Sequence, residues 1–421
     1  MPQQKIAGLF INPTLNKLRQ LVSRFPKEAG SVAVVSPARI HAQCSHWQKE
    51  LPNVHPYYAV KSNPDPLLLQ TLCNRFVNFD CASIREVDDV VQLIWPRDEC
   101  GPTIVYAHPM KSDRDINIIN KLNIKTTVVD SIEECKKLTA NGWNGSALLR
   151  VAVSDSMSKM PFSVKFGATK EEVVKIAMWS KVPISGVSFH VGSGCEDPEQ
   201  YRTAIEYAGG YVCNVLRKYG HYPKTIDIGG GFSAKQSEFQ PAAAVIRDAI
   251  SRATREYTYI AEPGRYYSQP AQDLFVKVIA KKPGPNGWRY VIDESLYGHF
   301  SCIPFDQQKP AWFRLPKSDA EPKRKLSQAI LFGRTCDSLD VVARGEMEEL
   351  EVGDWLYFPF MGAYTNATAS EFNGFPKPAI LEDTNSDLVP VATLESMIRA
   401  FHLNTRVTFS NALQPMRYDS T

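Results

Sequence analysis

Long apolar runs are missing from this sequence, and none approaches the ~18 consecutive apolar residues of a membrane-spanning helix. The first residues, MPQQKIAGLFINPTL, lack the apolar segment of a secretory signal peptide. An excess of charge of one sign is missing as well, because 48 Lys and Arg against 45 Asp and Glu leave a net charge of +3. We therefore expect a cytoplasmic protein with neither a membrane nor a nucleic acid as partner.

The nine cysteines are scattered and odd in number, and no CxxC motif occurs among them. Without a signal peptide, this pattern predicts free thiols in a reducing compartment. His41, Cys44 and His46 are close in sequence, but on a helix His46 points away from Cys44 and a fourth ligand is missing. We therefore predict no metal site. The 421 residues, 43% hydrophobic and 22% charged, indicate a globular chain of two or three domains.

Eight short apolar runs recur between residues 55 and 267, and helical patterns separate several of them. The runs are nearly continuous rather than alternating, as is typical of buried parallel strands. They are HPYYAVKS, VNFDCAS, PTIVYAHP, KTTVVDS, ALLRVAV, GVSFHVGS, TIDIGGG and YIAEPGR. Three helical patterns open with capping-box spacing, at Ser83 and Glu86, Ser131 and Glu134, and Thr169 and Glu172. The alternation predicts a (β/α)₈ barrel domain over residues 32–267, with a doubly wound open sheet as the alternative.

After Arg265 the strand-like runs follow one another without long helical patterns, and PGPNG at 283–287 is a turn signal between two of them. The polar, basic stretch from Trp312 to Lys325 predicts a surface loop with solvated charges. Residues 268–421 are therefore expected to form a mostly antiparallel β domain, against which residues 1–31 pack.

Ionisable residues and glycines gather where the predicted barrel strands end, which is where barrels build their active sites. They are Lys61, Asp80, His108, Asp130, Arg150, His190, Ser193, Gly229–Gly231, Glu262 and Arg265. Some have a structural alternative: Asp130 can cap a helix, and Arg150 can pair with a carboxylate.

Three of these elements suit a phosphate group: the glycines after TIDI, the EPGR loop with Gly264 and Arg265, and Ser193. Lys61 ends an apolar strand, where a lysine either reaches towards solvent or is desolvated and nucleophilic. A carboxylate such as Glu262 can keep a pyridine nitrogen protonated. A lysine, a phosphate cup and a carboxylate together predict pyridoxal phosphate as cofactor and no metal.

The chain resembles the eukaryotic-type ornithine decarboxylases, which are pyridoxal-phosphate enzymes of fold type III with a barrel and a β domain, similar to alanine racemase. The matching segments run in the family's order from about residue 30 to 375. They are PYYAVKSNPDP, FDCAS, SVKFGA, SFHVGSGC, DIGGGF, AEPGRYY, YGHFSCIPFD, CDSLD, MGAYT and FNGF.

The resemblance implies roles for the cofactor-binding residues. Lys61 would form the Schiff base with the cofactor, and Asp80 would lie beside it. His190 would stack on the cofactor ring, and Glu262 would pair with the pyridine nitrogen. The other cofactor contacts, mostly to the phosphate, would be Arg150, Ser193, Gly230, Gly231, Gly264, Arg265 and Tyr364.

The resemblance also implies decarboxylation of L-ornithine to putrescine by a homodimer with two shared sites. Cys336 would enter from the partner subunit and donate the proton to Cα. The substrate would be bound by Asp306, Asp337, Tyr297 and Phe372. Lys165 and Asp340 match a pair that bridges the subunits in the family, and an antizyme-like regulator is a possible partner.

Gln307 stands beside Asp306 where most members of the family carry His, so a lysine/ornithine decarboxylase of the same fold is an alternative. A catalytically inactive, antizyme-binding homologue is the alternative from a different class. The tail after Phe375 matches the family weakly.

Overall fold

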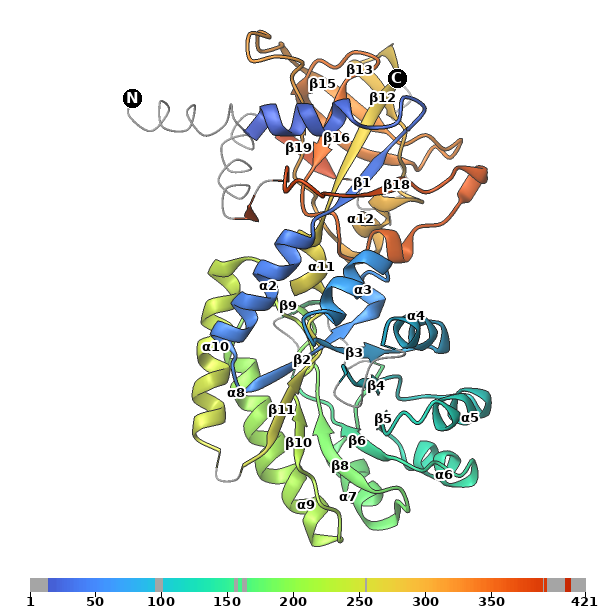
Figure 1. Cartoon of the computed structure of the whole chain (residues 1–421), viewed down its shortest axis with the longest axis vertical. Helices are drawn as coiled ribbons and strands as arrows, with labels where there is room; N and C mark the ends of the chain where they lie inside the picture. The colour runs from blue at the N-terminus through green and yellow to red at the C-terminus, as the bar shows by residue number, and fades with distance from the viewer. Residues whose placement is uncertain are drawn as a thin grey trace. The chain divides into compact units, whose positions relative to one another are not determined.

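The structure, a computed structural model, describes residues 14–94, 101–154, 158–160, 165–253, 256–388, 390–391 and 406–409. The chain divides into two compact units (Figure 1). The first unit is formed by Met1–Ile40 and Ser268–Thr421, and the second by His41–Tyr267.

The second unit is built on a closed barrel of eight parallel strands. Around the barrel they follow the order β10, β11, β2, β3, β4, β5, β6, β8. Their bounds are Val54–Ala59 (β2), Asn78–Cys81 (β3), Ile104–Tyr106 (β4), Thr126–Val129 (β5), Ser146–Arg150 (β6), Ile184–Ser188 (β8), Thr225–Asp227 (β10) and Thr258–Ala261 (β11). These are the eight predicted runs, so the predicted barrel is confirmed and the open sheet is excluded.

Apolar side chains fill the interior of the barrel. Val105, Val128, Leu148 and Ile260 form one buried cluster. Ile260 comes from β11, which lies across the barrel from the β5 strand of Val128, so their contact runs through the interior. This packed core leaves the carboxyl ends of the strands as the place for polar groups.

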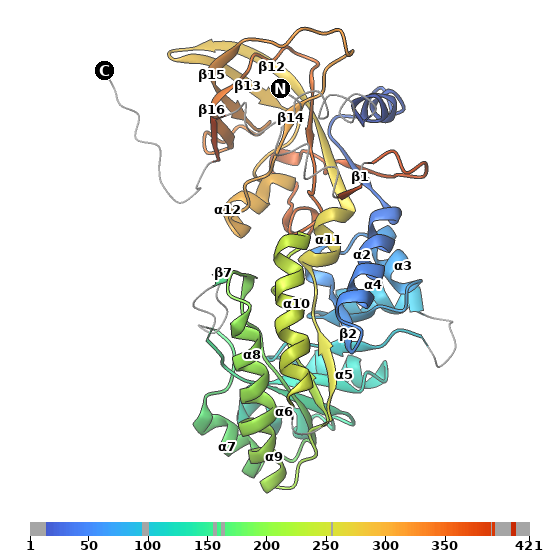
Figure 2. The ribbon, with the colours of Figure 1, turned by 90° about the vertical axis from the view of Figure 1, so that its left-hand side faces the viewer.

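Helices surround the barrel, and α8 and α10 lie side by side on its outside (Figure 2). The bounds are Pro37–Glu50 (α2), Pro66–Cys73 (α3), Ile84–Ile94 (α4), Asp113–Lys121 (α5), Ile132–Ala140 (α6), Lys170–Trp179 (α7), Glu199–Glu206 (α8), Cys213–Lys218 (α9), Gln236–Ser251 (α10) and Arg265–Ala271 (α11). A π-helical turn, Tyr207–Val212, joins α8 to α9, and β7 (Ser158–Met160) pairs with β9 (Ser193–Cys195).

Only one of the three predicted capping boxes forms in full, at Thr169 and Glu172. The Ser131 side chain does cap α6, but the carboxylate of Glu134 accepts the N–H of Lys111 instead of returning to the cap. The buried Lys111 pairs with Glu134 and keeps its carboxylate from the cap. The spacing of Ser131 and Glu134 gives no sign of this pair.

The first unit holds a mostly antiparallel sheet in the order β14, β17, β12, β13, β15, β16, β19, with β1 paired to β12 and β18. The bounds are Val32–Val35 (β1), Gln272–Gly284 (β12), Gly287–Ile292 (β13), Phe313–Arg314 (β14), Leu326–Phe332 (β15), Val341–Glu348 (β16), Trp355–Phe358 (β17), Ala379–Glu382 (β18) and Arg406–Phe409 (β19). The pairs β13–β15 and β1–β18 are parallel. The turn at 283–287 closes the β12–β13 hairpin, as its sequence predicts.

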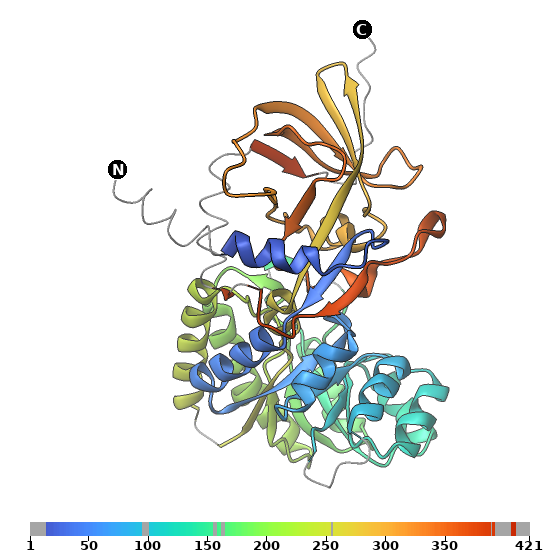
Figure 3. The same cartoon turned by 45° about the horizontal axis from the view of Figure 1, so that its top comes forward.

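Residues 14–23 form a helix that lies near β1 (Figure 3). Its Leu18 and Leu21 pack with Phe275 and Tyr357 of the sheet. β1 also belongs to this sheet, whereas the sequence places the start of the barrel domain at residue 32. A short, fully apolar strand carries no signal for which sheet it joins.

The basic stretch from Trp312 to Lys325 differs from its prediction at Arg314. This side chain is buried and forms ion pairs with Glu348 at 3.1 Å and with Glu321 at 2.9 Å. The prediction of solvated charges is wrong for Arg314, because β14 carries it into the sheet.

No helix in the described residues is long and apolar enough to cross a membrane. The cysteines of the described ranges are free thiols. Within the same ranges, no group of three His, Cys, Asp or Glu side chains is arranged to hold a metal ion.

Candidate active site

Lys61 and Asp80 lie at the carboxyl ends of two neighbouring barrel strands. Lys61 sits in a short 3-10 turn, Val60–Ser62, directly after β2, and Asp80 lies on β3. The Lys61 Nζ is 3.8 Å from the Asp80 carboxylate. Burial and the nearby Glu262 raise the pKa of Asp80 to about 7, although Lys61 opposes this shift. Asp80 can therefore hold or release a proton near neutral pH.

Two further acids lie at the carboxyl ends of the barrel strands β11 and β10. Glu262 follows β11, and Asp227 is the last residue of β10. Burial and the proximity of Asp227 raise the pKa of Glu262 to about 8, and burial raises that of Asp227 to about 6. The backbone N–H of Gly229 donates to Asp227 Oδ1 at 2.9 Å, which favours the ionised form of Asp227. Asp227 was missed from the sequence, although an acid within the apolar run TIDI was a usable signal.

Two cations face these acids. Lys61 and Arg150 both lower the pKa of Glu262 and of Asp80. Arg150 is the last residue of β6, and its guanidinium lies over the ring of Phe166, 5.0 Å from the centroid. Arg150 therefore lies near carboxylates, so a structural role as their ion-pair partner remains an alternative to cofactor binding.

His190 stands two residues beyond β8. Its Nδ1 accepts the N–H of Gly192 at 2.9 Å, which requires that nitrogen to be unprotonated. Burial, with Arg150 and Lys61 nearby, lowers the pKa of His190 well below its usual value. A Cβ on Gly230 would come within 2.8 Å of His190 Nε2, so glycine at 230 lets the imidazole lie against the backbone.

The glycines after β10 and β11 form a cradle with no Cβ atoms. Gly231 has a φ of +97°, and a Cβ there would lie 2.5 Å from the carbonyl oxygen of Gly192. A Cβ on Gly264 would lie 3.0 Å from the Cβ of Ser62, beside Lys61. Arg265 donates to Ser193 Oγ at 3.3 Å. Open backbone, a hydroxyl and a guanidinium together suit an anionic phosphate group.

The barrel residues fit pyridoxal phosphate. Neither carboxylate oxygen of Asp80 accepts a hydrogen bond within the described part of the chain. Glu262 retains its proton near neutral pH, because the cations of the site do not balance all of its buried carboxyl groups. A cationic ring nitrogen would supply the missing positive charge, and the glycine cradle would receive the phosphate.

In the first unit, the structure brings together four further candidates. The Tyr297 hydroxyl donates to Asp337, and the Tyr297 ring stacks on Phe372 with centroids 4.3 Å apart. The backbone N–H of Leu339 and the Tyr297 hydroxyl hold the pKa of Asp337 below its usual value. Cys336 is exposed beside them.

Asp306 and Tyr364 belong to two other segments of this unit. Asp306 ends the short helix α12 (Cys302–Asp306), and the amide of Gln308 donates to its carboxylate. The same amide donates to the carbonyl oxygen of Ala363, the residue before Tyr364. Gln308 was not singled out from the sequence.

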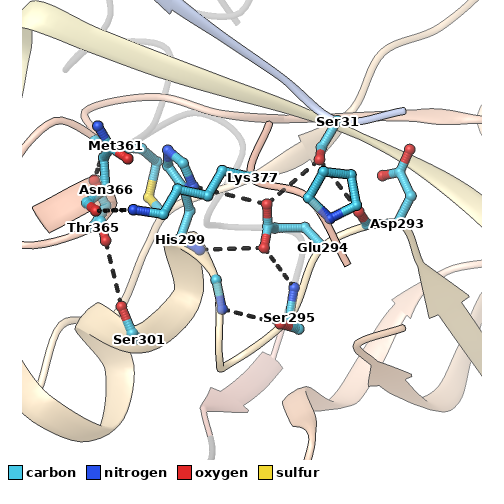
Figure 4. Close-up of polar contacts among 12 residues, drawn as sticks. Ser31, Asp293, Glu294, Ser295, His299, Ser301, Met361, Thr365, Asn366 and Lys377 are labelled. Carbon is cyan, nitrogen blue, oxygen red and sulfur yellow. Dashed lines mark hydrogen bonds and ion pairs between the residues drawn. The ribbon is translucent and has the colours of Figure 1, made fainter. Parts of the chain in front are cut away.

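A buried acid shapes the turn that carries Tyr297 (Figure 4). Glu294 accepts the backbone N–H of Ser295 at 2.9 Å and that of His299 at 3.2 Å. A Cβ on Gly298 would lie 1.8 Å from the Glu294 carboxylate, so a side chain there would displace this carboxylate. Burial raises the pKa of Glu294 to about 7 and lowers that of His299 to about 3, so His299 is neutral at pH 7 and Glu294 is about half protonated.

Asp340 ties this turn to the loop of Cys336. It is buried, and its carboxylate accepts the N–H of Leu296 at 2.8 Å and the N–H of Thr335 at 3.0 Å. The resemblance implies that Asp340 bridges the subunits, and the structure gives it partners within its own chain.

Comparisons with known proteins show the family and the fold of this chain. The family model described as the pyridoxal binding domain of pyridoxal-dependent decarboxylases matches residues 37–269. The chain is 36% identical to an ornithine decarboxylase of Panagrellus redivivus over 392 residues, covering 87% of each chain. It is also 36% identical to antizyme inhibitor 2 of Xenopus laevis over 356 residues, covering 79% of this chain and 76% of the relative.

Two solved structures share the fold. The arginine decarboxylase of Paramecium bursaria Chlorella virus, bound to agmatine, superposes with a TM-score of 0.81 at 33% identity, covering 87% of this chain and 100% of that one. The lysine/ornithine decarboxylase of Vibrio vulnificus, complexed with cadaverine, gives 0.77 at 29% identity, covering 87% and 98%. The chain therefore belongs to the barrel-fold, pyridoxal-phosphate-dependent decarboxylases, in the family of the eukaryotic-type ornithine decarboxylases.

Proposed function

We propose that this enzyme removes the α-carboxyl group of L-ornithine and releases putrescine and carbon dioxide. The observation that supports ornithine as the substrate is the Asp337 carboxylate, which Tyr297 and the Leu339 N–H keep ionised. An ionised acid suits a substrate with a distal ammonium group, because each charge satisfies the other, and Asp306 is proposed to bind the same group. The similarity to the Panagrellus ornithine decarboxylase supports the same substrate.

The resemblance to the family names the residues that would hold the cofactor. Lys61 would bind its aldehyde carbon, Glu262 would pair with its ring nitrogen, and His190 would lie against its ring. The phosphate would be bound by Ser193, Gly230, Gly231, Gly264, Arg265 and Tyr364. When bound, pyridoxal phosphate supplies a protonated ring that withdraws the electron pair left by the departing carboxyl group.

The chain's own groups would manage protons around that step. Asp80, with a pKa near 7, would take a proton from the Lys61 ammonium and return it once the two groups, 3.8 Å apart in this structure, come within hydrogen-bond distance. A neutral His190 adds no positive charge next to a cationic ring. The exposed Cys336 thiol is proposed to deliver the proton to Cα in a second copy of the chain, within a homodimer that shares its sites.

A decarboxylation assay tests the substrate and the role of Lys61. We expect carbon dioxide release from ornithine to exceed that from lysine and from arginine. Lys61→Ala is expected to abolish turnover, whereas Lys49→Ala, an exposed position on α2, is expected to leave it unchanged. A dominant lysine or arginine activity would overturn ornithine as substrate but not the reaction, and substantial activity in Lys61→Ala would overturn the role of Lys61.

The similarity to antizyme inhibitor 2 raises a second function, that of a catalytically inactive binding protein. The retained Lys61–Asp80 pair and the buried Glu262 favour the enzyme. Purified protein with the visible absorbance of bound pyridoxal phosphate and measurable turnover is the expected result. Colourless protein without turnover would favour the binding function.

A further inference from the structure

The side chain of Gln308 joins two segments that each carry a candidate site residue. Its Nε2 donates to Asp306 Oδ2 and, at 2.9 Å, to the carbonyl oxygen of Ala363. A side-chain amide nitrogen has two hydrogens, so both bonds form at once. Gln308 thereby braces the end of α12 against the segment that leads into Tyr364.

The backbone holds Gln308 in the orientation that this brace needs. Gln307, the residue after α12, lies in the left-handed region with a φ of +51°, which turns the chain sharply. The N–H of Gln308 then returns to the carbonyl oxygen of Cys302 at 3.0 Å. The amide is half-buried, so water competes less for its two acceptors than at an exposed position.

The brace links the two ends of the substrate site as proposed above. Tyr364 is proposed to contact the cofactor phosphate, and Asp306 to bind the distal ammonium of the substrate. The separation of these groups decides how many methylenes fit between the reacting carbon and the distal charge. A carboxylate held in one place discriminates between chain lengths, whereas a mobile one follows the longer substrate.

We propose that Gln308 is a specificity-determining residue, which fixes the Asp306 carboxylate against the Ala363–Tyr364 segment and so sets the preference between ornithine and lysine. This inference rests on the proposed role of Asp306 in binding the distal ammonium. Gln308 acts through Asp306 and is a positioning residue rather than a catalytic one.

The test uses the holoenzyme and three variants. Gln308→Met keeps the length of the side chain but removes both hydrogen bonds, and Gln308→Glu replaces the amide with a group that repels Asp306. Lys309→Ala, at the exposed neighbouring position, is the matched control. For each protein, kcat/KM is measured with ornithine and with lysine, and calorimetry gives the dissociation constants of putrescine and cadaverine.

We expect the ratio of kcat/KM for ornithine over lysine to fall about tenfold in Gln308→Met and further in Gln308→Glu, mainly through KM. The affinities for putrescine and cadaverine should converge by a similar factor, and Lys309→Ala should keep both ratios. Unchanged ratios in both Gln308 variants would overturn the proposal. A wild-type preference for lysine would overturn ornithine as the substrate. The role of Gln308 would still be tested by whether its variants change the ratio of kcat/KM for the two substrates.

Discussion

At the scale of single residues, burial sets the proton affinity of the barrel acids. The sequence placed Asp80 and Glu262 at the ends of strands, because an acid there interrupts an apolar run. It could not show that their pKa values rise to about 7 and about 8, since those shifts come from burial and from one another. Asp227, the third acid, interrupts the apolar run TIDI in the same way and was overlooked.

A pH dependence of stability follows for the cofactor-free protein. The pKa of Glu262 is raised from 4.5 to about 8, so the folded chain holds a proton that the unfolded chain releases. The resulting stability is full below about pH 4.5 and is lost as the pH rises through about 8. Asp80 and Asp227 shift in the same direction, whereas Lys61 and Arg150 oppose them.

We therefore expect the cofactor-free protein to unfold at a lower urea concentration at about pH 8 than at about pH 5.5. The side chain of Glu262→Gln cannot titrate. Its free energy of unfolding should therefore change less between about pH 5.5 and about pH 8 than that of the wild type, by a few kcal/mol. Identical pH dependence in the two proteins would contradict the shift assigned to Glu262.

At the scale of elements, one buried lysine joins the ends of two barrel strands. The Lys111 Nζ donates to the carbonyl oxygen of His108, after β4, at 2.9 Å, and to that of Val128, on β5, at 2.8 Å. It also pairs with Glu134 of α6 at 3.0 Å. The sequence offered only the capping pattern of α6, because a lysine in a loop carries no local sign of burial.

Removing this lysine should destabilise the barrel. Lys111→Met would leave two carbonyl oxygens without their donor, and Glu134 with only the partly exposed Lys137 as its side-chain cation in the described structure. We expect a loss of about 3 kcal/mol in the free energy of unfolding, measured by urea denaturation. Lys121→Met, at the exposed end of α5, is the control and should cost little. A change in Lys111→Met as small as that of the control would show that the buried pair contributes nothing net.

At the scale of the whole molecule, the candidate site residues divide between the two units. The barrel carries Lys61, His190 and Glu262, and the first unit carries Cys336 and Tyr364. Within the barrel Lys61 pairs with Asp80 on the neighbouring strand, and within the first unit Tyr297 contacts Asp337 and Phe372. The proposed homodimer would join Cys336 of one copy to Lys61 of the other.

A mixing experiment tests these shared sites. Lys61→Ala and Cys336→Ala are each expected to be nearly inactive with ornithine. If the two variants exchange subunits freely, half of the dimers are mixed and each mixed dimer has one intact site of two. About a quarter of the wild-type activity should then return, measured as carbon dioxide release. No recovery after demonstrated subunit exchange would show that Lys61 and Cys336 act in the same copy.

The amino-acid sequence by itself determined the barrel, its eight strands and the family, because buried parallel strands and the motifs at their ends are local patterns. Only the tertiary structure decided where β1 pairs, that Arg314 and Lys111 are buried, and that Gln308 braces Asp306. Those outcomes depend on residues distant in the chain. Burial and pairing depend on which side chains surround a residue in the folded protein. The residues next to it in the sequence do not determine those neighbours.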